Sequence, residues 1–228
     1  MIILHDLVFQ DDRRPSPFCW RVKFALKHKG LDWREEPMGF TEKDKIAFAA
    51  SQTVPVIQDG TAAVKDSWAI ARHLEQAYPG RPLFPGEGGV AYARFVSNWV
   101  DTTVHGALFP VIIGDLYARV RPADQAYFRE SRGKRLGTTD FAAFQAKARE
   151  KGIDAFRGVL EPARRLLREQ PYLNGTEPAW TDYALAGAFL WARISSPLDL
   201  LAAEDPVAGW RERMLDLHGG MGRKARAA

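Results

Sequence analysis

The stretch "RRPSPFCWRVKFALKHKG", residues 13–30, predicts a helix with a well-marked beginning and end. Ser16 stands at the N-cap position, and Pro17 follows at the first helical position, where its missing N–H costs nothing. Gly30 is typical of a helix C-terminus. The apolar residues in between have helical spacing: Phe18, Val22, Ala25 and Leu26.

Ser16 has two interpretations. A serine at the N-cap normally turns its hydroxyl onto the free N–H groups of its own helix, which is a structural role. The same position lies in the positive field of the helix terminus, which favours an anion. A thiolate placed there would be stabilised, and the ordinary thiol pKa of about 8.5 would fall.

Around this helix, residues 1–80 predict alternating strands and helices. "IILHDL" (2–7) and "LDWREEP" (31–37) have the pattern of strands, and "FTEKDKIAFAA" (40–50) that of a short helix. "VPVI" and "AAVK" flank "QDG" and predict a hairpin, after which a helical stripe begins at Ser67. The order is βαβαββα.

A linker separates this part from an all-helical part. "YPGRPLFPGEGG" is dense in proline and glycine, and strand patterns almost vanish beyond it. The predicted division is 1–80, a linker at 81–89, and a helical domain at 90–228. Helical patterns cover four stretches: 90–114, 124–132, 140–168 and 181–194. The last, "DYALAGAFLWARI", is apolar nearly all round, so we expect it at the centre of a bundle.

Composition limits the classes of function. The chain has 228 residues, 46% apolar and 26% charged, with no apolar run long enough to span a membrane. Its N-terminal apolar run is too short for a signal peptide, and a single cysteine excludes an internal disulfide, so a cytoplasmic location is expected. The net charge of +4 is spread out, and phosphate-loop and zinc spacings are missing, so we expect no nucleic acid and no metal.

Two further motifs contain groups suited to binding a peptide. In "TVPVI" (53–57), a cis Val54–Pro55 bond would turn the Val54 backbone outward, free to pair with an extended peptide; an ordinary edge-strand proline is the alternative. Ser67 is a natural N-cap for the next helix, and the neighbouring Asp66 can accept from an ammonium group. With Ser16, these groups would hold a zwitterionic peptide whose thiol points at Ser16.

Four stretches together resemble the cytosolic glutathione transferases: "SPFCWRVKFALKHKG", "TVPVI", "DSWAIARHLEQAYP" and "NGTEPAWTDYALAGAFLW". The resemblance implies a thioredoxin-like N-terminal domain, an all-α C-terminal domain, a homodimer and glutathione as co-substrate. In the serine-type classes the catalytic hydroxyl stands immediately before the proline of such a motif. By this resemblance Ser16 would keep the glutathione sulfur as a thiolate. The other binding positions that it implies are Val54 and Pro55 for the cysteinyl backbone and Asp66 and Ser67 for the γ-glutamyl end.

More narrowly, "GFTE" (39–42) and "NWVDTTV" (98–104) are similar to the bacterial β-aryl-etherase-like branch and the fungal Fua-type transferases. Some members of that branch use glutathione to break aryl ethers: the thiolate attacks the carbon beside a ketone and expels a phenolate. The chain departs from the family pattern at Ala179, which replaces the usual capping residue three positions before Asp182, and at Thr53, where lysine is common. Gln52 or Lys45 is then the candidate anchor for the glycyl carboxylate; a solvated loop residue without a binding role is the alternative for both.

"SPFC" also occupies the place of the C-x-x-C motif of thioredoxin-like folds. Disulfide exchange requires an attacking thiolate at the first position of that motif. Here this position is Ser16, which has no thiol. Cys19 falls on the apolar side of the helix, where a buried thiol is usually inert. We therefore expect Ser16, not Cys19, to activate the thiol.

The acceptor substrate is expected between the two parts. One stripe of the helix that follows the linker has four polar or aromatic residues: Asn98, Thr102, His105 and Phe109. Phe9 and Phe18 would add an aromatic wall. His105 would protonate a leaving phenolate or polarise a ketone, or it is a histidine merely hydrogen-bonded between helices. Residues 115–152 have the pattern of a helical hairpin without an assigned role.

The predicted activity is the conjugation of glutathione to an aromatic electrophile, as in detoxification or aromatic-compound metabolism, with possible cleavage of an aryl ether. Two alternatives stay open. An isomerase would recycle glutathione, whereas a transferase consumes it. A carrier for glutathione or a hydrophobic ligand would bind without lowering the thiol pKa.

Overall fold

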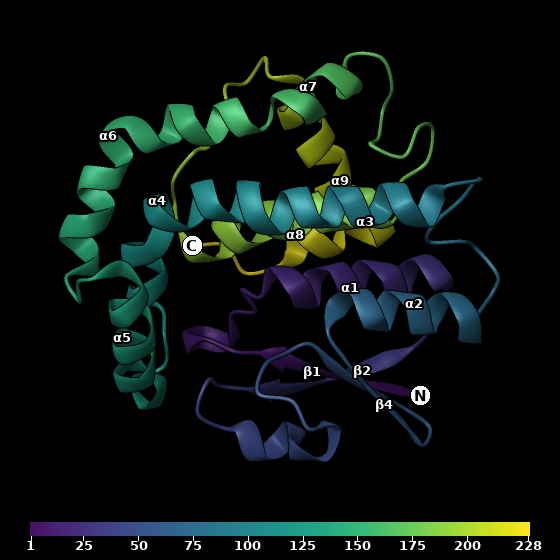
Figure 1. Cartoon of the computed structure of the whole chain (residues 1–228), viewed down its shortest axis with the longest axis horizontal. Coiled ribbons are helices and arrows are strands. Elements are labelled where there is room, and N and C mark those ends of the chain that lie inside the picture. The colour runs from purple at the N-terminus through teal and green to yellow at the C-terminus, as the bar shows by residue number, and fades with distance from the viewer.

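The computed structural model describes residues 1–228 and shows a four-stranded sheet beside a set of helices (Figure 1). The strands lie in the order β2-β1-β3-β4 and span β1 Ile2–Leu7, β2 Trp33–Met38, β3 Val56–Asp59 and β4 Ala62–Lys65. β1 is parallel to β2 and antiparallel to β3, and β3 and β4 form the predicted hairpin. The predicted thioredoxin-like fold of the first part is confirmed.

Two α-helices cover one face of this sheet, and a 3₁₀ segment lies on the other (Figure 1). Their bounds are α1 Pro17–Lys29, α2 Ser67–Ala77 and η2 Lys43–Ala49. α1 begins after Ser16 and ends at Gly30, whose φ of 70° is left-handed, as expected at a helix C-terminus. The loop between β1 and α1 contains one more 3₁₀ turn, η1 Gln10–Asp12.

Residues from Gly89 onward contain helices and no named strand. They are α3 Gly89–Trp99, the π-helical segment η3 Val100–Val104, α4 His105–Ala118, α5 Pro122–Leu136, α6 Phe141–Val159, α7 Glu161–Leu167, α8 Trp180–Ser195 and α9 Pro206–Lys224. The sequence patterns did not predict α9. The chain between α2 and α3 has no helix or strand, while the boundaries at 80 and 90 stay predictions. No helix is long and apolar enough to cross a membrane.

α8 lies at the centre of the helical part, as its apolar sequence predicted. Of its residues only Trp191 and Arg193 are not buried. It packs against α1 of the first part and against α3, α4 and α9. Ala179 has no side-chain acceptor for the helix start, but Asp182 Oδ2 accepts the Ala179 N–H at 3.2 Å, so one half of the capping box is present.

Over residues 115–152, where a helical hairpin was predicted, α5 and α6 follow one another across a short turn, and the ring centroids of Phe128 in α5 and Phe141 in α6 lie 5.8 Å apart. α6 packs along α4, whereas α5 extends toward the first part (Figure 1). Thr41 donates to Asp124 through its N–H and its hydroxyl at 2.9 and 2.8 Å, and Arg121 pairs with Glu42 at 2.7 Å. These polar contacts with the loop after β2 hold α5 over the edge of the first part.

Gly187 of α8 lies against the start of α1, and we expect Gly187→Ala to destabilise the protein. An added Cβ would meet the backbone oxygen of Pro17 at 2.4 Å, so the helices must separate. Overpacking of this kind costs about 1–3 kcal/mol of unfolding free energy, measurable by urea denaturation. Gly158→Ala is the matched control, because no atom lies within 4 Å of its added Cβ and alanine favours a helix. Equal stability of both variants would contradict this account.

Candidate functional site

The loop before α1 is held so that Ser16 faces a cavity. Trp20 Nε1 donates to the carbonyl oxygen of Arg14 at 2.7 Å, which fixes the turn into the helix. The Arg14 guanidinium lies 3.0 Å from a carboxylate oxygen of Glu35 in β2 and 3.7 Å from the buried Asp6 in β1. The turn is therefore attached to both parallel strands of the sheet.

Ser16 caps its helix and keeps a free proton. Its hydroxyl oxygen accepts the Cys19 N–H at 3.2 Å, and the residue is only 5% exposed. A hydroxyl that accepts one hydrogen bond still has an O–H to donate. The capping role and the proposed contact with a thiolate are thus compatible in one geometry.

Cys19 lies in the core and does not line the cavity. Its side chain is fully buried, with the sulfur 4.0 Å from the backbone oxygen of His5. Burial, and next the nearby carboxylate of Asp6, raise the pKa of the thiol well above its ordinary value. A protonated, inaccessible thiol is a poor nucleophile, which agrees with the prediction for Cys19.

Val54 presents an unpaired backbone. The Val54–Pro55 bond is cis, and no hydrogen bond in the chain uses the N–H or C=O of Val54. The next carbonyl, of Pro55, accepts from the Asp66 N–H at 3.2 Å. The N–H and C=O of Val54 are therefore available to an extended ligand.

Asp66, rather than Ser67, is the N-cap of α2, which corrects the predicted capping role of Ser67. One Asp66 oxygen, Oδ1, accepts the N–H groups of Trp68 and Ala69, both at 3.0 Å. Asp66 has φ 72°, a left-handed conformation that Asp tolerates better than most residues. Ser67 becomes the first helical residue and is buried. The second Asp66 oxygen accepts no hydrogen bond within the chain.

These groups line two adjoining hollows. A cavity of about 480 Å³ contains five of the predicted residues in its wall: Gln52, Val54, Pro55, Asp66 and Ser67. A second cavity of about 510 Å³ contains Ser16. Phe18, Gln52, Thr53 and Val54 line both, so the two hollows adjoin. Lys45 lines neither, because its ammonium group lies 3.2 Å from Glu42 and donates to the Pro37 carbonyl.

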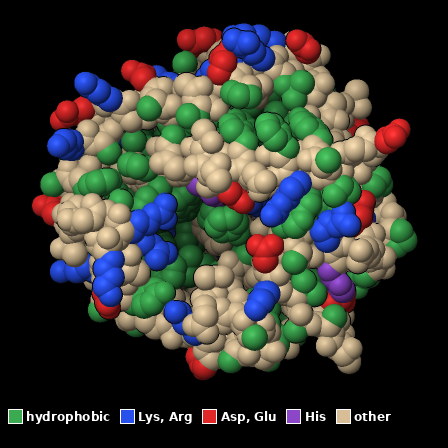
Figure 2. All heavy atoms as spheres, in the orientation of Figure 1, with side chains coloured by type: hydrophobic (Ala, Val, Ile, Leu, Met, Phe, Trp, Pro, Cys, Tyr) green, Lys and Arg blue, Asp and Glu red, His purple; other side chains and the backbone are tan.

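The larger cavity is aromatic, and Figure 2 shows it as a hollow with hydrophobic side chains on its walls. Five predicted acceptor residues line it: Phe9, Phe18, Thr102, His105 and Phe109. Asn98 does not; it is exposed on α3. The reason is η3, whose wider turns put the residues before it out of phase with those after it. Asp101 lines the cavity in its place.

His105 lies edge-on to two aromatic rings of the wall. Its ring centroid is 5.4 Å from that of Phe18 and 5.5 Å from that of Trp191, both nearly perpendicular. Nδ1 lies 3.8 Å from Asp101, and the buried Nε2 has no partner. Burial, with the positive charge of Arg21, lowers the pKa of His105 to about 3. The imidazole is therefore neutral near pH 7, so it is not a cationic acid there.

We expect the His105 imidazole signals in an NMR titration to stay constant from pH 8 to pH 5. Because the folded-state pKa lies below the unfolded value of about 6.5, the unfolded state binds the proton first, and stability falls as pH drops below 6.5. The free energy of unfolding should fall by about 2 kcal/mol between pH 7 and pH 5. In His105→Gln this pH-dependent fall should be absent when urea denaturation is measured at both pH values. A His105 signal that titrates near pH 6 would contradict the buried neutral imidazole.

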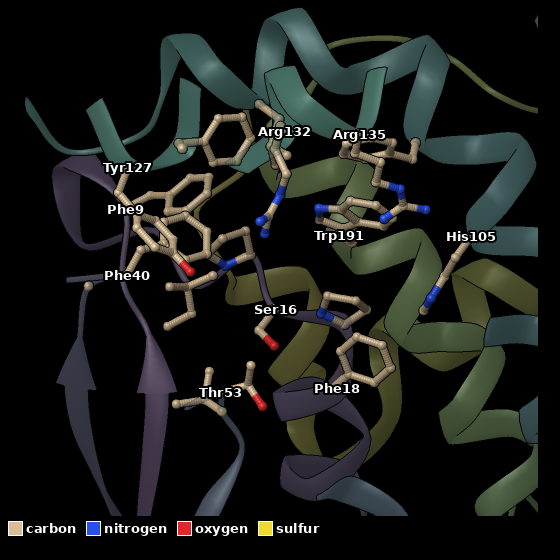
Figure 3. Close-up of a pocket in the computed structure, with 18 of the residues that line it drawn as sticks. Phe9, Ser16, Phe18, Phe40, Thr53, His105, Tyr127, Arg132, Arg135 and Trp191 are labelled. Carbon is tan, nitrogen blue, oxygen red and sulfur yellow. The ribbon is translucent and has the colours of Figure 1, made fainter. Parts of the chain in front are cut away.

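Several wall residues were missed in the sequence. Trp191 was assigned to the buried centre of α8, although it contributes a ring stacked on Phe109 with centroids 6.0 Å apart. Phe40 and Tyr127 lie opposite, and Arg132 and Arg135 extend from α5 (Figure 3). The spacing 128, 132 and 135 indicates one helix face, but nothing local to the sequence shows what that face meets. No cluster of His, Cys, Asp or Glu side chains is suited to a metal.

Comparisons with known proteins find relatives over both parts of the chain. A model described as "Glutathione S-transferase, N-terminal domain" matches residues 15–77, and one described as "Glutathione S-transferase, C-terminal domain" matches residues 91–216. Glutathione S-transferase U22 of Arabidopsis thaliana is 23% identical over 198 residues, which is 85% of this chain and 77% of that protein.

Solved structures have the same architecture. Glutathione transferase GSTFuA3 from Phanerochaete chrysosporium superposes with a TM-score of 0.76 and 25% identity, covering 98% of this chain and 93% of that chain. A glutathione S-transferase of Ceriporiopsis subvermispora, solved in complex with glutathione, has a TM-score of 0.73 and 21% identity, with 98% and 94% covered. The likeness extends over both parts of the fold.

Proposed function

The chain belongs to the glutathione S-transferase family, and we propose that it transfers glutathione to an aromatic electrophile. The observation that carries this proposal is that the two hollows share a wall of four residues and lie side by side. One has an unpaired Val54 backbone and a carboxylate at Asp66; the other is aromatic; and Ser16 lies in the wall of the aromatic one. Peptide and electrophile would meet beside the Ser16 hydroxyl.

The smaller hollow suits glutathione as the co-substrate. Val54 offers one N–H and one C=O to the cysteinyl backbone, the pairing of an added strand. The free oxygen of Asp66 accepts from the γ-glutamyl ammonium group, and Ser67 at the start of α2 donates to its carboxylate. Gln52 lines both hollows and is the remaining candidate for the glycyl carboxylate.

Ser16 then acts on the sulfur. Its O–H donates to the thiolate while its oxygen keeps the Cys19 N–H, and the positive end of α1 adds to the stabilisation. The thiolate attacks the electrophilic carbon, a carbon–sulfur bond forms, and the leaving group departs with the bonding pair. For a β-aryl ether the leaving group is a phenolate, which takes a proton from solvent. The stretches "GFTE" and "NWVDTTV", which resemble the etherase-like branch, are the support for this finer activity.

Mass spectrometry of mixtures with glutathione and a panel of aryl halides and aryl ethers tests the proposal. A thioether conjugate and loss of free thiol are expected, together with a thiolate absorbance of bound glutathione that appears below the ordinary pKa of a free thiol. A rearranged product with glutathione intact identifies an isomerase. Binding with an unshifted thiol pKa and no product identifies a carrier and contradicts the proposal.

Asp66→Asn isolates the contact with the ammonium group. Asparagine accepts the same capping N–H groups and tolerates the left-handed backbone, so α2 is kept. Loss of the charge should raise KM for glutathione about tenfold, as expected for one charge-assisted hydrogen bond, with little change in kcat. Steady-state kinetics at saturating electrophile measure both constants. Asp59→Asn, at a carboxylate that bonds His73 and Tyr78 outside both hollows, is the matched control.

A homodimer is part of the proposal. α3 exposes three large apolar residues, Val90, Tyr92 and Phe95, and Phe95 is 72% exposed. Such a surface is typical of a contact between proteins. Sedimentation equilibrium is expected to report twice the chain mass, and Phe95→Glu is expected to shift it toward the monomer.

A further inference from the structure

Two arginines of α5 enter the larger cavity without an acidic partner. Arg132 makes one side-chain hydrogen bond, to the Ser131 hydroxyl at 3.1 Å, and Arg135 makes none although it lines the cavity. Figure 3 shows both side chains extending from α5 into the space above Ser16 and beside Trp191. Two nearby cations, by contrast, do have acidic partners. Lys134 of α5 lies 2.7 Å from Glu130, and Arg121, just before α5, lies 2.7 Å from Glu42.

Aromatic rings hold the two guanidinium groups in place. The Arg132 carbon Cζ lies 5.5 Å from the ring centre of Phe40 and 5.2 Å from that of Phe128. The Arg135 Cζ lies 5.2 Å from the ring centre of Phe109. Contact with a ring uses the face of a guanidinium and leaves its N–H groups, which lie in the plane, free to donate. Both groups are oriented donors without acidic acceptors.

The charge of the cavity wall is unbalanced. Asp101 is the only acidic residue that lines it, and its carboxylate is 2.5 Å from the buried guanidinium of Arg21. Arg132 and Arg135 thus stay unopposed, and Figure 2 shows Lys or Arg side chains on the α5 side of the hollow. Burial is the main cause that lowers the pKa of Arg132, which means that its cation is poorly compensated. A neutral arene alone would cover these N–H groups without bonding them, at a cost.

We propose that the acceptor substrate is an aromatic carboxylate, and that Arg132 and Arg135 select it by donating to the carboxylate oxygens. The rings of the wall pack against the arene, and the guanidinium fork matches the geometry of a carboxylate. This assignment deepens the proposed glutathione transfer and rests on it, since it names the class of electrophile. Arg132 and Arg135 are specificity residues; they take no part in the bond that forms at sulfur.

The test compares two probes, 4-chloro-3-nitrobenzoate and its methyl ester, in which esterification removes the charge and adds one methyl group. In both, the glutathione thiolate forms a carbon–sulfur bond at the carbon that carries chlorine. The carbon–chlorine bond breaks, chloride leaves with the bonding pair, and the thiol proton goes to solvent. For each variant, kcat/KM for the acid is divided by kcat/KM for the ester, and this acid-to-ester ratio is then divided by that of the wild type. The normalisation cancels the intrinsic reactivity of the two probes.

Arg132→Gln and Arg135→Gln are each expected to lower this ratio about tenfold, and the double variant about a hundredfold, the loss expected for charge-assisted hydrogen bonds. Lys134→Gln removes one positive charge from the same helix, between the two arginines, at a side chain that is 76% exposed and does not line the cavity. Its ratio should stay close to that of the wild type, because exposed charges are screened. An unchanged ratio in the double variant overturns the proposal.

A binding measurement separates this proposal from the proposed activity. Calorimetry is done with two synthetic conjugates, S-(4-carboxy-2-nitrophenyl)glutathione and its methyl ester, so no reaction is needed. If the wild type converts neither probe, glutathione transfer to these arenes fails, while a preference for the acid conjugate that Arg132→Gln and Arg135→Gln remove still supports the arginine site. The variants could instead raise KM for glutathione while the acid-to-ester ratios of kcat/KM and of conjugate affinity stay unchanged. In that case the arginines bind glutathione, and the proposal is wrong.

Discussion

Ser16→Ala is expected to lower kcat/KM for glutathione conjugation about 100-fold at pH 7, the loss typical of one donor to a developing or bound anion. The hydroxyl is the polar side chain at the start of α1 that faces the larger cavity with a proton to donate. Without it, the pKa of bound glutathione should move back toward the free-thiol value of about 8.5, which ultraviolet absorbance of the thiolate records across pH. The pH profile of kcat/KM should shift by the same amount.

Two variants separate this effect from folding. Ser16→Ala also removes the N-cap, which costs about 1 kcal/mol of stability, whereas Ser16→Thr retains both the cap and a hydroxyl. Ser16→Thr should therefore keep a lowered thiolate pKa. Cys19→Ala, one turn further along α1 in the core, should leave the thiolate pKa in place. If Cys19→Ala alone abolished the shift, the assignment of the thiol-activating residue would be wrong.

Asp182→Ala is expected to destabilise the protein more than Gly187→Ala, with a loss of about 3–5 kcal/mol of unfolding free energy. The carboxylate is fully buried at the start of α8. It accepts the backbone N–H groups of Leu173, Asn174 and Ala179 at 2.7, 3.2 and 3.2 Å, and Trp210 Nε1 at 2.9 Å. Removing it leaves the donors of Leu173, Ala179 and Trp210 buried without an acceptor, and the half-buried Asn174 N–H also loses its acceptor.

Urea denaturation measures this loss, and the controls are in the same domain. Asp182→Asn keeps the shape but replaces one acceptor oxygen with a donor, so an intermediate loss is expected. Asp154→Ala removes a carboxylate whose side chain is 90% exposed, and its effect should stay within about 0.5 kcal/mol. Near-neutral behaviour of Asp182→Ala would show that the buried hydrogen bonds are replaced by others.

The elements of the first part could be predicted because their signals are local. Pro17 after Ser16 marks a helix start, Gly30 supplies the left-handed residue at its end, and "QDG" closes a hairpin. The motifs were also enough to indicate glutathione, while the preference for Ser16 over Cys19 as the thiol-activating residue stays a prediction. The α9 helix was missed because its pattern is interrupted, with non-helical backbone at residues 217–220.

The acceptor end of the site could not be predicted in the same way. Helical spacing placed Asn98 on the cavity stripe, but the wider turns of η3 rotate it away. Arg132 and Arg135 belong to a stretch whose role the sequence did not show, and they line the cavity on a helix that is bonded to the loop after β2.

The sequence by itself determined the strands of the first part, most of the helices and the capped start of α1, because hydrophobic periodicity, proline and glycine act over a few residues. The tertiary structure decided what shares the cavity with Ser16. Trp191, Arg132 and Phe9 are far apart in the chain, and their meeting depends on how α5 and α8 pack against the sheet domain. Local propensity does not encode such long-range contacts, so the charge of the larger cavity emerges only in the folded molecule.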